Sequence, residues 1–78
     1  MILYCFDLKS KDLRSYNTLK RRFYYHLNLL NKHNYLWNTK SVFAINNKDE
    51  VEFDPFFSKF KDWLVLYKSK VESMQKIY

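Results

Sequence analysis

The stretches MILYCFDL (residues 1–8) and KDLRSYNTLKRRFYYHLNLLN (residues 11–31) decide the predicted fold. The first is a nearly continuous apolar run with β-favouring side chains, which is typical of a strand buried on both faces of a small sheet. In the second, apolar residues recur every three or four positions, which predicts an amphipathic helix over residues 11–31. Ser10 is the predicted cap of this helix, with Asp12 in its first turn. The apolar positions are Leu13, Tyr16, Leu19, Phe23, Leu27 and Leu30.

The second half of the chain predicts more β structure and then a second helix. Residues 35–45 favour two short strands, or one strand strongly bent at Asn38-Thr39. Asp54 before Pro55 predicts a helix start, because aspartate can cap a helix and proline suits its first position. Apolar residues then keep helical spacing at Phe56, Phe57, Phe60, Trp63, Leu64, Tyr67, Val71 and Met74. Residues 75–78 are expected to fray or to add a short edge strand.

The predicted order is therefore strand, helix, one or two strands, helix, and an optional final strand. Two amphipathic helices need a shared apolar surface, and one face of a sheet provides it. The predicted fold class is α/β (α+β): a ferredoxin-like sandwich, β-α-β(β)-α with a short final strand as an option. A chain of 78 residues makes this a single domain, residues 1–78.

Several classes of site are excluded by composition. Cys5 is the only cysteine, so neither a disulfide nor a cysteine-based zinc site is expected. Glycine is absent, which excludes a phosphate-binding P-loop and a dinucleotide fingerprint. His26 and His33 have no carboxylate spaced to form a catalytic triad. The short apolar start reaches Asp7 too early for a signal peptide, so we expect a cytoplasmic protein, in the host cytoplasm if the source is a phage or another virus.

The charge distribution predicts a polyanionic partner. Lysine and arginine total 14 against 8 acidic residues, a formal net charge of +6. Between Leu8 and Lys48 the only acidic residue is Asp12, and the other acids begin at Asp49. A basic half of this kind attracts nucleic acid or an acidic membrane surface, and we expect nucleic acid and no membrane. The alternative is a surface kept soluble by like charge.

The outward side of the first helix is the predicted nucleic-acid contact. Its arginines can pair with phosphates, and its tyrosine can stack on an unpaired base. The alternative is an ordinary solvent-exposed helix face. The predicted binding residues are Lys11, Arg14, Thr18, Arg21, Arg22 and Tyr25.

Asp7 is the candidate catalytic and metal-binding residue. It lies at the end of the first predicted strand, where metal and catalytic groups often sit in open α/β sheets. One carboxylate makes a poor magnesium site, so a second copy of the chain would have to supply another. The alternative is a solvated strand terminus.

A set of short motifs resembles the Cas Two family of small, CRISPR-associated, ferredoxin-like dimers, which are related to the VapD toxins. These motifs are the strand that closes on Asp7, Asp12-Leu13-Arg14 before a basic helix, and Ser41-Val42-Phe43, all within residues 1–45. The resemblance implies a homodimer, a symmetric pair of Asp7 side chains able to hold Mg or Mn, and contacts to a nucleic-acid backbone. The chain departs from the family in lacking a glycine after the first helix and in having Thr39 where a glutamine is usual.

The leading hypothesis is a basic homodimer that grips DNA or RNA through phosphate contacts. A dimer is expected because seven Phe, seven Tyr and two Trp are more rings than so small a monomer should hide. One alternative is a metal-dependent endonuclease built on paired Asp7. The other is a small phage-type inhibitor that binds a host enzyme, a ribonucleoprotein or another host defence protein.

Overall fold

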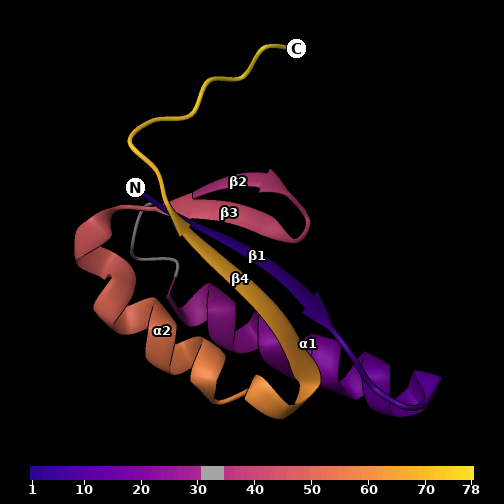
Figure 1. The fold of residues 1–78 in the computed structure, drawn as a ribbon. Helices are drawn as coiled ribbons and strands as arrows, with labels where there is room; N and C mark the ends of the chain where they lie inside the picture. The colour runs from indigo at the N-terminus through magenta and orange to yellow at the C-terminus, as the bar shows by residue number, and fades with distance from the viewer. Residues whose placement is uncertain (31–34) are drawn as a thin grey trace.

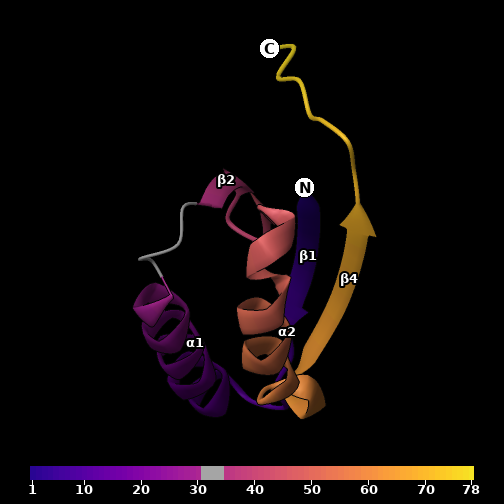
Figure 2. The same cartoon turned by 90° about the vertical axis from the view of Figure 1, so that its left-hand side faces the viewer.

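Four antiparallel strands form one sheet, and two helices cover one of its faces (Figure 1). The side view in Figure 2 places both helices on the same side of β1 and β4. This computed structural model describes residues 1–30 and 35–78, and for residues 35–38 the backbone alone. The elements are β1 (Ile2–Leu8), α1 (Leu13–Leu29), β2 (Tyr35–Thr39), β3 (Val42–Ile45), the short helix η1 (Asn47–Asp49), α2 (Glu50–Ser58), the short helix η2 (Lys61–Trp63) and β4 (Leu64–Lys70).

The strand order confirms the predicted fold class. The sheet runs β2-β3-β1-β4, and every neighbouring pair is antiparallel. With the element order β-α-β-β-α-β, this is a ferredoxin-like arrangement. β1 pairs with β4 along its whole length, from Ile2 opposite Lys70 to Leu8 opposite Leu64. The β1–β4 pair therefore defines two ends of the sheet, one at Ile2 and Lys70 and the other at Leu8 and Leu64.

The core lies between the sheet and the two helices. Along β1 the even-numbered residues Ile2, Tyr4, Phe6 and Leu8 are buried, whereas Asp7 is exposed. The prediction that this strand is buried on both faces is therefore wrong, because both helices pack on one face and leave the other open. All seven phenylalanines are buried within the single chain, so packing against a second copy is not needed to hide them: Phe6, Phe23, Phe43, Phe53, Phe56, Phe57 and Phe60.

Helix α1 is shorter than predicted and has a different cap. Asp12, rather than Ser10, is the N-cap, and its side chain accepts hydrogen bonds from the Ser15 amide at 2.8 Å and hydroxyl at 3.1 Å. Residue 31 of the predicted range lies outside the described residues, as does His33. Leu13 was predicted to join the apolar stripe but is 74% exposed. The buried part of the stripe is Leu19, Phe23 and Leu27.

The second helix was predicted wrongly at both ends. It begins at Glu50, so Pro55 lies inside it and not at its first position. It ends at Ser58, and Leu64–Lys70 form strand β4 in place of the predicted continuation. Val65 and Tyr67 are good strand formers, and pairing with the free edge of β1 satisfies hydrogen-bonding groups that a longer helix would have left unpaired.

The β2–β3 hairpin agrees with the prediction, whereas the C-terminal segment does not. Residues 35–45 form two strands, and their register shifts between Trp37 and Thr39, close to the predicted bend. Residues 71–78 form neither helix nor strand, so the edge strand expected over 75–78 is absent. Figure 1 shows this last segment leaving the sheet beyond β4. The Val71 amide donates to the Met1 carbonyl at 2.9 Å and anchors the start of this segment.

Candidate nucleic-acid interface

All six residues predicted to contact nucleic acid are exposed. Five lie on α1, and Lys11 lies in the segment just before it. They do not form one surface, however. Because successive helical residues are about 100° apart, Arg21 and Tyr25 lie on the crest of α1, facing away from the core, and Arg22 lies on the flank nearer α2.

A groove along that flank brings three of the predicted residues together. It has a volume of about 320 Å³, and its lining includes no acidic side chain. The buried side chains of Leu19 and Phe60 contribute to its floor. We call it the arginine groove, and the other residues that line it are Ser10, Arg14, Ser15, Thr18, Arg22 and Trp63. Two guanidinium groups in a groove that no carboxylate lines make it suited to phosphate.

Thr18 has a different role from the one predicted. Its hydroxyl donates to the Arg14 carbonyl at 3.2 Å, within the helix. The hydroxyl has one hydrogen, so Thr18 cannot also donate to a phosphate in this geometry. Ser15 is occupied in the same way, because its hydroxyl donates to Asp12. The cationic contacts in the arginine groove therefore come from Arg14 and Arg22.

A second hollow adjoins the arginine groove and has a balanced charge. Its volume is about 580 Å³, and it is lined by Lys9, Ser10, Lys11, Asp12, Ser15, Asp62 and Trp63. Two lysines face two aspartates here, so its attraction for phosphate is weaker than that of the arginine groove. Hydrogen bonds from the Ser15 amide and hydroxyl hold the pKa of Asp12 below its usual value, which keeps this carboxylate charged at neutral pH.

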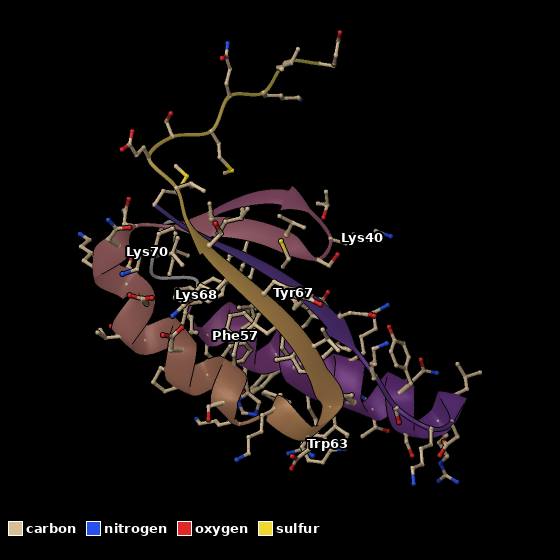
Figure 3. All side chains as sticks on the ribbon, viewed as in Figure 1. Lys40, Phe57, Trp63, Tyr67, Lys68 and Lys70 are labelled. Atoms are coloured by element: carbon tan, nitrogen blue, oxygen red, sulfur yellow. The ribbon has the colours of Figure 1, made fainter. Side chains whose placement is uncertain are left out.

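Trp63 is the residue that sequence reasoning missed. It lines both hollows and is 46% exposed, although it was assigned to the core of a long second helix. Its amide donates to the Phe60 carbonyl at 2.9 Å, and its carbonyl accepts from the Lys9 amide at 2.8 Å. These two bonds fix the Trp63 backbone between α2 and the segment after β1. Figure 3 shows Trp63 beside the start of β4, at the opposite end of the strand from Lys70.

The other predicted residues lie around this pair of hollows. Tyr25 on the crest is 62% exposed, and its ring packs edge-on against His26 at 5.3 Å. On the opposite flank of α1, Lys20 and Lys40 line a separate hollow of about 510 Å³ with Tyr24 and Thr39. Basic side chains therefore lie on both flanks of α1, but only the hollow on the flank of the arginine groove also contains Trp63.

The acidic cluster of the second half is engaged elsewhere. Lys68 of β4 contacts Glu50 at 2.6 Å and Asp54 at 2.8 Å, and the buried Tyr4 hydroxyl donates to Asp54 at 2.6 Å. Burial opposes ionisation of Asp54, but the hydrogen bonds from Lys68 and Tyr4 outweigh it and lower the pKa of that carboxyl. These acids pair with β4 and do not line the arginine groove.

Asp7 is placed apart from the arginine groove, on the open face of the sheet. It is exposed, lies opposite Val65 of β4, and its carboxylate is 3.6 Å from the Lys9 ammonium. Among the described residues no group of three or more His, Cys, Asp or Glu side chains could hold a metal ion. One carboxylate beside a lysine does not fit Mg or Mn, so a single copy of the chain does not supply the predicted metal site.

Comparisons with protein families, curated proteins and solved structures find no match for this chain. In the described part of the chain, no helix is both long enough and apolar enough to cross a membrane.

Proposed function

We propose that this protein binds nucleic acid through phosphate contacts made by the arginine groove. The observation that carries the proposal is the pairing of Arg14 and Arg22 in a groove whose lining has no acidic residue. Guanidinium groups bind phosphate oxygens in a bidentate manner, and they remain charged at any physiological pH. The net charge of +6 adds a long-range attraction that would speed association.

Phosphate contacts of this kind carry no base sequence information by themselves. We therefore expect weak binding with little sequence preference. Arg21, Tyr25 and Lys11 surround the groove and extend the positive surface to the crest of α1 and to the segment before it. They form the outer part of the proposed interface, and the two groove arginines form its centre.

Self-association at β4 is part of the same proposal. β4 is an edge strand of the sheet in the described chain, so the backbone groups on its outer side face no neighbouring strand. An unpaired edge can pair with the same strand of a second copy across a two-fold axis. Such a dimer would carry two arginine grooves and would strengthen binding to a long nucleic acid.

The test is a charge reversal with a matched control. Arg14→Glu/Arg22→Glu should weaken binding of a labelled oligonucleotide, measured by fluorescence anisotropy at low salt, by about tenfold or more. Lys48→Glu/Lys76→Glu makes the same change in net charge in η1 and in the segment after β4, away from the groove and from the β4 edge. β1 spans seven residues from Ile2 to Leu8, so the two ends of the sheet lie about 20 Å apart.

The groove variant and its control distinguish binding at this groove from an effect of net charge. Strong loss in the groove variant with little loss in the control supports the proposal. Equal loss in both variants would mean that binding depends on net charge and not on this groove. No binding of DNA or RNA by the parent protein would refute the proposal and would leave a protein partner as the remaining hypothesis.

A further inference from the structure

We infer that the nucleic acid is single-stranded and that one unpaired base stacks on Trp63. This inference rests on the function proposed above, because it concerns the same interface. It assigns the arginine groove to the backbone and the adjoining, charge-balanced hollow to a base.

The indole ring of Trp63 is accessible to a ligand. Trp63 is 46% exposed and lines both hollows, so a ligand that enters either of them meets it. No aromatic ring of the described residues stacks on it. Its backbone is held by hydrogen bonds on both sides, to Phe60 and from Lys9, so the side chain projects from a fixed backbone position. Ordering a side chain on a fixed backbone costs less entropy than ordering a flexible segment.

The two hollows differ in the charge of their lining residues. The arginine groove has two cations and no acid, which suits a phosphate. The adjoining hollow contains Asp12 and Asp62, whose carboxylates would repel a second phosphate. A base is uncharged and has polar edges that hydroxyls and carboxylates can pair with. The hollow's volume of about 580 Å³ also lies within the range of small-molecule sites.

An unpaired base suits this site better than a paired one. In a duplex the faces of the bases are covered by their neighbours, so stacking on Trp63 would require a base to be flipped out. Flipping costs a few kcal/mol, whereas an unpaired base is already accessible. A site built from a basic groove and a stacking aromatic therefore favours single strands.

An alternative residue for base stacking, Tyr67, lies on the open face of the sheet. Tyr67 is 71% exposed there and lies opposite Cys5 in the β1–β4 register. Tyr67 lines neither the arginine groove nor the adjoining hollow. Figure 3 shows Tyr67 midway along β4 and Trp63 at the strand's start. Tyr67 is therefore the matched control for Trp63.

The experiment compares single-stranded and duplex DNA of about 12 nucleotides, a length within the range of single-strand sites. By fluorescence anisotropy, Trp63→Leu should weaken single-strand binding about 5- to 150-fold, the loss expected for one stacked base. Trp63→Tyr should keep most of the affinity, and Tyr67→Leu, which leaves the backbone edge of β4 intact for pairing, should keep all of it. Duplex binding should be weaker than single-strand binding in the parent and nearly unchanged in Trp63→Leu.

A second readout does not depend on the folding of a Trp63 variant. The chain has two tryptophans, so Trp37→Phe leaves Trp63 as the only indole. Its fluorescence should be quenched by the single strand, with the same Kd that anisotropy gives, and much less by the duplex. Single-strand binding without quenching, or equal affinity for both forms with no effect of Trp63→Leu, overturns the inference but not the proposed function. Failure of the parent to bind either form overturns both.

Discussion

The Tyr4 hydroxyl gives the sharpest test of how the fold is held together. Tyr4 lies on β1 with no exposed surface, and its hydroxyl donates to Asp54 of α2 at 2.6 Å. Its ring packs on Phe57 at 4.8 Å and Phe43 at 5.6 Å. Tyr4→Phe removes the hydrogen bond and keeps these ring contacts, so its effect measures the bond between the sheet and α2.

The expected loss follows from the partners that remain. A hydrogen bond to a charged group contributes about 1.5–3 kcal/mol to stability. Asp54 keeps its contact with Lys68, and its side chain is 41% exposed, so water can replace the lost hydroxyl. The cost should therefore lie near the lower limit, about 1.5 kcal/mol. For a domain of this size that corresponds to a decrease in Tm of roughly 6–12 °C.

Urea unfolding followed by circular dichroism measures this loss, with Tyr67→Phe as the control. The Tyr67 side chain is 71% exposed, and its hydroxyl makes no hydrogen bond within the described chain. The control should therefore change the free energy of unfolding by no more than about 0.5 kcal/mol. If both variants unfold at the same urea concentration as the parent, the Tyr4–Asp54 bond does not contribute to stability and the account of α2 docking is wrong.

Two further predictions concern pH and self-association. Because the folded pKa of Asp54 is lowered, its contribution to stability is present above its unfolded pKa of about 3.9 and is lost as pH falls through the folded pKa. Urea midpoints measured at decreasing pH should fall less steeply for Asp54→Asn than for the parent, and identical curves would contradict this. Light scattering coupled to size exclusion should give about twice the chain mass of 9.7 kDa at tens of micromolar protein, and a mass near 9.7 kDa would rule out the dimer.

Local patterns in the sequence predicted most of the fold. The apolar start of the chain, the spacing along α1 and the bend near Thr39 indicated β1, α1 and the β2–β3 hairpin, because neighbouring residues decide these features. The apolar residues from Phe60 to Val71 fit a helical spacing, but Leu64 and Leu66 also alternate as in a strand with one buried face. Pairing with β1 resolves this ambiguity, and that pairing is a tertiary contact that residue spacing does not report.

The candidate site was less predictable than the fold. Helical geometry correctly indicated that Arg14, Arg21 and Tyr25 face away from the core. It could not show that Arg14 and Arg22 line a groove with Trp63, because Trp63 comes from η2, more than 40 residues later in the chain. The dimer was expected from an excess of aromatic residues, but the single chain buries every phenylalanine. The case for self-association now depends on the edge of β4.

The salt dependence of nucleic-acid binding tests the central proposal most directly. Each phosphate contact to a single strand should contribute about 0.7 to the slope of log affinity against log salt. The affinity of the parent should therefore fall steeply as salt rises, and Arg14→Gln/Arg22→Gln should lower the slope by about 1.4. An affinity that is indifferent to salt, or a double variant that keeps the slope of the parent, would contradict phosphate binding in the arginine groove.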